Sequence, residues 1–237
     1  MSEINDNSEA AGSRQAGDNG QANRTTGNAG PIQALLLGDF TEAPWHPLEP
    51  ARAEIQSILA PEFLLTATED YNVLNELNQA EYPLCISYTD CWNRALAPEQ
   101  TAGLLRYVAG GGGLLVIHNG VSLQSSPELA QLIGARFTGH PPYQSLNYHP
   151  VYGHHLLDGV ESFALDEEPY LFELDSLAAR TEFLTFEFEG ERYPAGWERA
   201  YGLGKLVYLQ PGHHAPSFKP ASYQRLVRNC ARWASGR

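Results

Sequence analysis

Two histidines of this chain each follow a short apolar run that is typical of a buried strand. His118 comes directly after residues 114–117, and His213 follows residues 206–210 after a Pro-Gly step. In open α/β sheets, ligands collect at the carboxyl ends of the strands. Because an imidazole binds metals and moves protons near neutral pH, the two positions predict acid/base chemistry or metal binding at one edge of a sheet.

Three more side chains able to hold a metal or move a proton lie in predicted loops. His46 lies past the end of the first predicted strand, His140 stands in a Gly-His-Pro-Pro segment whose prolines fix the backbone, and Glu168 precedes a proline and a tyrosine. Imidazoles mixed with a carboxylate suit zinc or another divalent metal. The irregular spacing of these residues leaves the cofactor itself unspecified. The candidate metal ligands are His46, His118 and His213.

Each of these residues also has a purely structural interpretation, which the sequence leaves open. His118 would then cap a strand end, His140 would lie on an exposed turn, and Glu168 would lie on a solvated turn. His154 and His155 have no partner at metal-ligand spacing and are expected on the surface. Nucleophilic catalysis is not favoured, because the turn after residues 114–117 lacks the Ser or Cys of a nucleophile elbow.

The composition limits which kinds of binding partner and which cellular compartment we expect. The 237 residues carry a net charge of −13, which argues against nucleic acid, because phosphate binding needs Lys and Arg. No apolar run is long enough to cross a membrane, and the N-terminus lacks the apolar core of a signal peptide. Three cysteines make no disulfide framework and fit a reducing cytoplasm. We therefore expect a cytoplasmic protein that binds a small molecule.

The elements that position these residues are predicted from hydrophobic periodicity. Residues 1–30 are rich in Ser, Asn, Gln and Gly and predict a disordered tail, and residues 31–237 predict a single domain. Strand and helix patterns alternate up to Gly134, which predicts a mostly parallel α/β sheet with helices on both faces. The expected strands are 32–37, 63–67, 84–88, 114–117 and 206–210, and the expected helices are 50–60, 71–77, 98–108, 127–133 and 222–233. Short strands or irregular arms are expected at 170–174, 182–188 and 195–199.

Several motifs, taken in order, resemble one known family. The motif residues are 111–118, 133–141, 168–170, 194–197, 201–205 and 212–213, followed by Phe218. In this order and spacing the chain resembles the ThuA-like (trehalose utilisation) family from about Ile32 to Trp233. It has Lys205 where the family pattern usually has Arg, and Glu167 where the pattern usually has Asp.

The resemblance implies a fold and a general area of metabolism. The fold would be a flavodoxin-like, class I glutamine amidotransferase-like three-layer sandwich, without the amidotransferase nucleophile. The ligand would be a sugar of trehalose or keto-disaccharide metabolism, and a homo-oligomer is one candidate assembly. As an enzyme, the protein would use His118, His213 and Glu168 for catalysis and His140, Tyr170, Trp197 and Asn119 for ligand binding. The alternative is a non-catalytic ligand-binding or regulatory module on the same scaffold.

Overall fold

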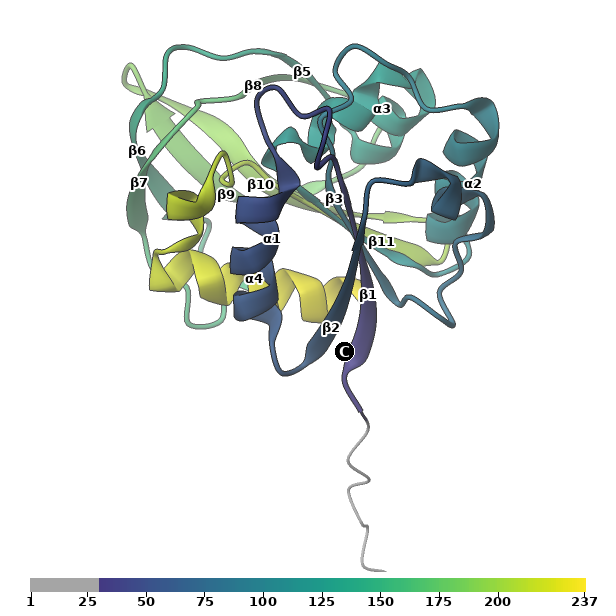
Figure 1. Cartoon of the computed structure of the whole chain (residues 1–237). Coiled ribbons are helices and arrows are strands. Elements are labelled where there is room, and N and C mark those ends of the chain that lie inside the picture. The colour runs from purple at the N-terminus through teal and green to yellow at the C-terminus, as the bar shows by residue number, and fades with distance from the viewer. Residues whose placement is uncertain (1–29) are drawn as a thin grey trace, which may run out of the picture. The chain divides into compact units, whose positions relative to one another are not determined.

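This computed structural model contains a nine-stranded sheet (Figure 1). The strands of the first half of the chain, which alternate with helices, form one side of it. The structure describes residues 30–237, so the predicted disordered tail lies, except for Gly30, outside the described residues. Five neighbouring strands run parallel, in the order β2-β1-β3-β4-β11. Their bounds are β1 (Ile32–Gly38), β2 (Phe63–Thr68), β3 (Leu84–Tyr88), β4 (Gly113–Ile117) and β11 (Gly204–Leu209).

These parallel strands are apolar because helices cover both faces of the sheet. In β4, Leu115 and Ile117 face the core on one side, and Leu114 and Val116 face the core on the other. Helices α1 (Leu48–Leu59) and α4 (Ala221–Ala234) pack side by side on the first face. Helices α2 (Pro98–Ala109) and α3 (Pro127–Ile133) pack on the second.

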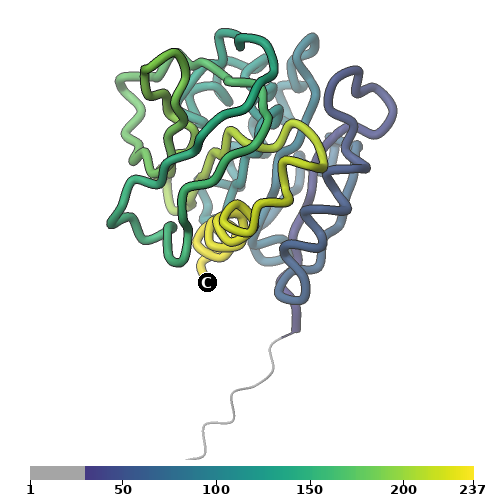
Figure 2. The backbone as a smooth tube through the Cα atoms, turned by 90° about the vertical axis from the view of Figure 1, so that its left-hand side faces the viewer, coloured from purple at the N-terminus to yellow at the C-terminus, as the bar shows by residue number. Residues whose placement is uncertain are grey.

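The second half of the sheet is antiparallel and continues the order as β10-β9-β6-β7. Figure 2 shows the molecule from the side of these strands. A separate two-stranded sheet joins β5 to β8. The bounds are β5 (Ala135–Gly139), β6 (Gln144–Pro150), β7 (Phe163–Glu167), β8 (Leu171–Leu174), β9 (Thr181–Phe188) and β10 (Glu191–Tyr201).

The predicted α/β fold class is confirmed, and the central sheet is mixed, with a parallel half and an antiparallel half. Strands β5, β6 and β7 were not expected, because they are short, only half buried and rich in polar residues. The segment expected as a helix at 71–77 is a 3₁₀ helix, η1 (Tyr71–Glu76). The remaining 3₁₀ helices are η2 (His118–Ser125), η3 (His155–Leu157) and η4 (Ala215–Phe218).

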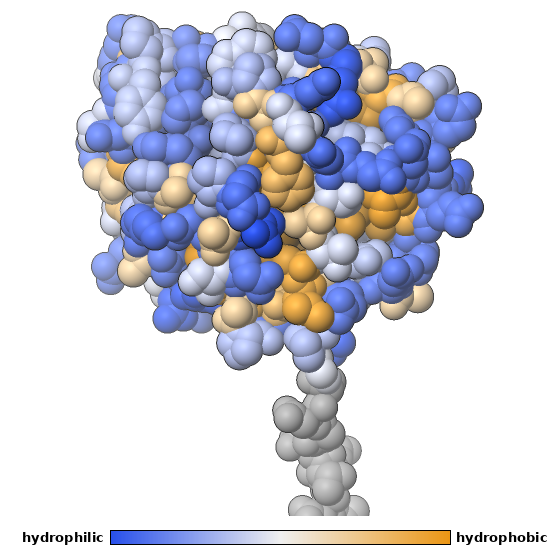
Figure 3. Space-filling view, in the orientation of Figure 1, coloured by the Kyte–Doolittle hydropathy of each residue, from blue (hydrophilic) through white to orange (hydrophobic). Residues whose placement is uncertain are grey.

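The surface in the orientation of Figure 1 is mostly hydrophilic, with apolar residues gathered near its centre (Figure 3). Exposed apolar residues of this kind are normal on folded proteins. Among the described residues, no helix has the length and apolar character needed to span a membrane. All three cysteines are buried and unpaired.

Candidate functional site

His118 occupies a strained turn between β4 and η2. Its φ of +45° lies in the left-handed region, which costs a non-glycine residue about 1–3 kcal/mol. The core holds the turn in place, because the histidine is fully buried and its Nδ1 lies 2.7 Å from the carbonyl oxygen of Gln210. A carbonyl oxygen only accepts, so Nδ1 carries the proton and Nε2 keeps a lone pair. Nε2 is buried and has no hydrogen-bond partner within the described part of the chain.

His213 is presented by the loop after β11, at the same edge of the sheet. Gly212 before it has a φ of +144°, which favours glycine. A Cβ there would lie 2.7 Å from a side chain of β4 and 3.1 Å from Cβ of His118, so only glycine lets the loop approach this closely. His213 points into the site, whereas His214 turns away and contacts Ser217.

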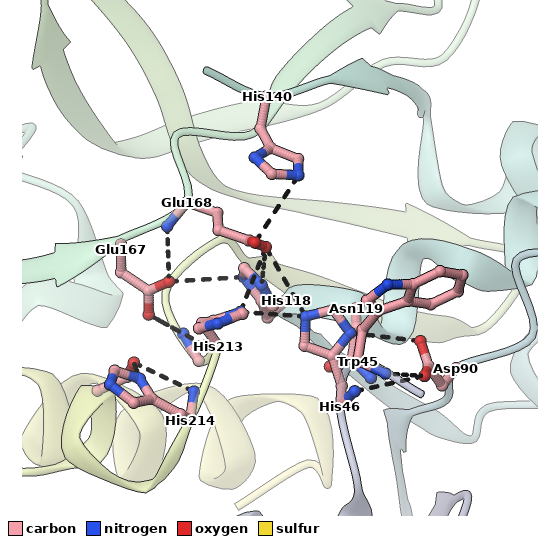
Figure 4. A network of polar contacts seen from close by, with 12 residues as sticks. Trp45, His46, Asp90, His118, Asn119, His140, Glu167, Glu168, His213 and His214 are labelled. Carbon is pink, nitrogen blue, oxygen red and sulfur yellow. Dashed lines mark hydrogen bonds and ion pairs between the residues drawn. The ribbon is translucent and has the colours of Figure 1, made fainter. Parts of the chain in front are cut away.

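Four side chains converge beyond the carboxyl ends of β1, β4, β7 and β11 (Figure 4). Glu168 Oε2 lies 3.2 Å from His213 Nδ1, 3.5 Å from His118 Nε2 and 3.8 Å from His46 Nε2. His46 Nε2 and His213 Nδ1 are 3.1 Å apart. One nitrogen of each histidine and one carboxylate oxygen therefore all lie within 4.8 Å of one another.

The three imidazole rings face this point from different directions. The ring planes cross at 66° for His46 and His118, at 84° for His46 and His213, and at 73° for His118 and His213. The ring centroids are between 5.1 and 5.5 Å apart. Because each nitrogen lone pair lies in its ring plane, crossed rings can direct three lone pairs at one ion.

Asp90, which follows β3, orients His46 from behind. Its Oδ1 lies 3.3 Å from His46 Nδ1, and its Oδ2 accepts the backbone N–H groups of Trp45 and His46, both at 3.3 Å. Nδ1 thus carries a proton, and Nε2 faces the other ligands. A carboxylate in this position fixes the ring of a metal-binding histidine and makes it more basic.

Burial and mutual contacts set the charges of the cluster. Burial lowers the pKa of His118 and outweighs the nearby Glu167 and Glu168, so this imidazole is neutral at pH 7. Burial also acts to lower the pKa of His46, but Asp90 and Glu168 outweigh it and raise that pKa. For Glu168, burial acts to raise the pKa, but the three imidazoles outweigh it. The pKa of Glu168 is therefore far below its ordinary value, and the carboxylate is charged.

A pocket of about 190 Å³ opens beside the cluster. Four aromatic residues and three cluster or loop residues line it: Trp45, Trp92, Phe137, Tyr170, His46, His140 and Glu168. The Tyr170 ring stacks on His118 at a centroid distance of 4.1 Å. His140 Nδ1 lies 2.9 Å from the carbonyl oxygen of Pro141 and so carries a proton. Its Nε2, 3.7 Å from Glu168 Oε1, is left as an acceptor at the pocket.

The structure brings most of the predicted site residues together. His46, His118, Glu168 and His213 converge, and His140 and Tyr170 line the adjoining pocket. A larger hollow of about 330 Å³, between α3 and the sheet of β5 and β8, contains none of the predicted residues.

Two predicted ligand-binding residues lie elsewhere. Trp197 is fully buried in β10, where its Nε1 donates to the carbonyl oxygen of Ile133 at 2.9 Å, so it belongs to the core rather than to a ligand-binding wall. Asn119 is also fully buried. Its amide donates to the carbonyl oxygens of Thr89 at 2.8 Å and Tyr88 at 3.3 Å, so it holds the turn after His118 and does not line the pocket.

A second group of histidines surrounds Glu198. His154 Nε2 lies 3.5 Å from one carboxylate oxygen and His155 Nε2 lies 3.1 Å from the other. The surface expectation is wrong for His154, whose side chain is 9% exposed. Its Nδ1 accepts the N–H of Leu156, so Nε2 carries the proton and faces the carboxylate. The two rings are nearly parallel, at 28°, and cannot aim two lone pairs at one ion, so we interpret this group as two imidazoles packed against one carboxylate.

Sequence reasoning missed several residues of the site. Asp90 follows a predicted strand, so the strand-end rule that selected His118 could have selected it as well. Gln210 and Glu167 act on the site through backbone groups, which no residue pattern reveals. The aromatic pocket residues that were missed are Trp45, Trp92 and Phe137.

The sequence profile of a family described as trehalose utilisation, ThuA, matches residues 40–234. The chain belongs to the ThuA family. The matched region contains all four converging residues of this ThuA chain. No curated protein sequence matches the chain.

Solved structures agree with this assignment at the level of the fold. A ThuA-like protein from Parabacteroides merdae has a TM-score of 0.71 at 16% identity, over 87% of this chain and 90% of its own. A ThuA-like protein from Bacteroides uniformis has a TM-score of 0.69 at 17% identity, over 87% and 92%. A β-galactosidase from Bacillus circulans sp. alkalophilus has a TM-score of 0.59 at 13% identity, over 85% of this chain but 31% of its own. At these identities the likeness shows the fold alone.

Proposed function

We propose that this protein holds a divalent metal ion of the zinc type and there converts an unphosphorylated sugar related to trehalose. The metal ligands would be His46 Nε2, His118 Nε2, His213 Nδ1 and Glu168 Oε2. The observation that carries the proposal is the pair formed by His118 Nε2 and Glu168 Oε2. A buried lone pair faces a charged carboxylate at 3.5 Å, and two acceptors in this position attract a cation.

The separations between donor atoms support the same ion. Bonds of about 2.0–2.1 Å to nitrogen and oxygen in a tetrahedron place the ligand atoms about 3.3 Å apart. Four of the six separations run from 3.1 to 3.8 Å, and all six lie within 4.8 Å. Asp90 behind His46 and the Gln210 carbonyl behind His118 supply the outer contacts that metal-binding histidines use.

The pocket supports a neutral sugar as the ligand. Its lining includes four aromatic rings, on which the apolar faces of a sugar can stack, and the carboxylate and imidazoles offer partners for hydroxyl groups. No Lys or Arg is present among the described residues that line it, which disfavours a phosphorylated substrate. A cytoplasmic location fits such a substrate and the three unpaired cysteines.

The chemistry divides between the ion and His140. A bound metal would polarise a carbonyl or hydroxyl group of the sugar. His140 Nε2 carries a lone pair at the pocket and would take a proton from the carbon or oxygen next to that group. The rigid Gly-His-Pro-Pro loop holds the base in place.

The metal content of the untagged protein, purified without added metal, tests this proposal. We expect close to one equivalent of divalent metal per chain by elemental analysis. A His118→Ala/His213→Ala double variant should lose it, because two of the four donors are removed.

A His154→Ala/His155→Ala double variant is the matched control and should retain the metal, since these histidines belong to the separate group around Glu198. A folded protein that takes up no metal even from an excess of Zn²⁺ would rule the proposal out. With the metal bound, NMR of trehalose and of its 3-keto derivative then separates turnover from binding alone.

A further inference from the structure

Glu167, the last residue of β7, is a fully buried carboxylate beside the converging side chains. Its Oε1 accepts the N–H groups of Gly212 at 2.7 Å and His213 at 3.0 Å, and its Oε2 is 3.2 Å from the N–H of Glu168 (Figure 4). A buried carboxylate without partners would be very costly, and these three backbone donors satisfy it. The side chain is therefore fixed, and it fixes the backbone of both segments in turn.

These contacts join two segments that the sheet does not pair. Glu168 follows β7, the last strand in the sheet order, whereas His213 follows β11 near the middle. The backbone N–H groups of Gly212 and His213 are available to Glu167 because these residues lie beyond the end of β11 and form no inter-strand hydrogen bonds. Gln210 adds one side-chain contact to the carbonyl oxygen of Glu168. Glu167 is thus the carboxylate that holds the His213 loop against the Glu168 turn.

The charge of Glu167 also suits a place behind a cation. An ion of charge +2 held by three neutral imidazoles and one carboxylate keeps a net charge of +1. Glu167 Oε2 lies 3.9 Å from His118 Nδ1, so its charge lies on the far side of a second ligand ring. Carboxylates in this outer position orient the ligands, and removing one commonly weakens metal binding about 10- to 100-fold.

We propose that Glu167 is the positioning residue of the metal centre, setting His213 Nδ1 and Glu168 Oε2 at coordinating distance. This inference rests on the proposed metal centre and deepens it. Glu167 itself contacts neither the ion nor the sugar; it acts through the backbone of its neighbours. Its loss should therefore change both the affinity for the metal and the geometry around it.

Titration of the full chain with Co²⁺ tests this role, because visible absorption reports both binding and coordination geometry. Glu167→Gln should weaken Co²⁺ binding about 10- to 100-fold and alter the intensity of the visible bands. Gln cannot satisfy two sets of N–H donors, since its amide nitrogen would face one of them. Asp166→Asn, an exposed neighbour on the same strand, is the matched control and should leave both readouts unchanged.

A double-mutant cycle separates positioning from a general loss of structure. In a His213→Ala background, Glu167→Gln should cost less affinity than it does in the wild-type chain, because one of the ligands it positions is already absent. If Glu167→Gln does not fold, Glu167→Asp keeps the charge, shortens the reach and should show a smaller change in the same direction.

The outcomes distinguish this inference from the proposed function. A wild-type chain that binds no Co²⁺ overturns both. A wild-type chain that binds Co²⁺, together with a folded Glu167→Gln or Glu167→Asp variant of equal affinity and identical spectrum, overturns the role of Glu167 alone. Equal losses in the wild-type and His213→Ala backgrounds would also overturn positioning through His213.

Discussion

The position of the proton on each imidazole decides what the central side chains can bind. The Gln210 carbonyl holds the proton of His118 on Nδ1, and Asp90 does the same for His46. Both rings therefore turn Nε2, rather than Nδ1, toward Glu168. The cluster is thus prepared for a cation by atoms that lie behind its ligands.

Trp92 and Trp197 lie in different environments and lead to opposite expectations. Trp92 lines the pocket and is partly exposed, so Trp92→Leu should weaken binding of trehalose to the metal-loaded protein several-fold while changing stability little. Trp197→Phe should instead lower the free energy of unfolding by about 1–3 kcal/mol, because it removes core volume and leaves the carbonyl of Ile133 without its donor. Calorimetric titration and urea unfolding measure the two effects.

If the Trp197 variant lost sugar affinity without losing stability, Trp197 would belong to the binding site after all. If the Trp92 variant bound trehalose as tightly as the wild-type chain, the pocket beside the cluster would not be the sugar site.

Residue types at strand ends could be predicted, but the direction of a side chain along a strand could not. His118 and His213 were identified because each follows a predicted strand, and ligands collect at the carboxyl ends of strands, whereas Glu168 was identified only as a carboxylate in a predicted loop. Trp197 was expected on a ligand-binding wall because sugars stack on aromatic rings, but residue type alone does not show which way a side chain points, and this ring lies in the core. Asp90 was missed although the same rule applies to it.

Among the elements, the parallel strands were predicted, β8, β9 and β10 were expected as short strands or irregular arms, and β5, β6 and β7 were not expected. β1, β3, β4 and β11 are continuous apolar runs because both of their faces are covered. β6 and β7 expose one face, so their apolar residues alternate with polar ones over too few positions to stand out. Glu167 and Glu168 were therefore predicted to lie in a loop rather than at the end of a strand.

The packing of α2 against η1 gives a prediction at this level. Gly103 lies in α2, and a Cβ there would lie 1.9 Å from the carbonyl oxygen of Leu74. Gly→Ala in a helix is ordinarily stabilising by up to about 1 kcal/mol. Here Gly103→Ala should lower the free energy of unfolding by about 1–3 kcal/mol, because the helix must move away from η1. Urea unfolding of the Gly103→Ala variant and of the wild-type chain measures this difference in free energy.

Ala102→Gly, at the exposed neighbouring position, is the control for helix propensity and should cost about 0.5–1 kcal/mol. A Gly103→Ala variant more stable than the wild type would show that α2 and η1 are less tightly packed than the structure indicates.

At the level of the whole chain, the four proposed ligands come from segments spread between residues 46 and 213. The complete donor set therefore exists only in the folded chain, and a bound ion stabilises folding by mass action. A free metal concentration 100 times the Kd should add about 2.7 kcal/mol to the free energy of unfolding. We expect Zn²⁺ to raise the melting temperature and a chelator to lower it.

The His118→Ala/His213→Ala variant should show no such shift between Zn²⁺ and chelator. An equal shift in that variant would place the stabilising ion elsewhere on the chain.

The contact between Glu167 and Gly212 also describes how the sheet is curved. Four inter-strand steps separate β11 from β7, and at about 4.8 Å each a flat sheet would hold them roughly 19 Å apart. The Glu167 carboxylate nevertheless lies 2.7 Å from the Gly212 nitrogen. The antiparallel half must therefore be strongly curved, like part of a barrel. At its open edge the Glu167 side chain, rather than backbone pairing, joins β7 to the loop after β11. The outermost strand is in this way turned inward at its end, and the site lies at the point of closure.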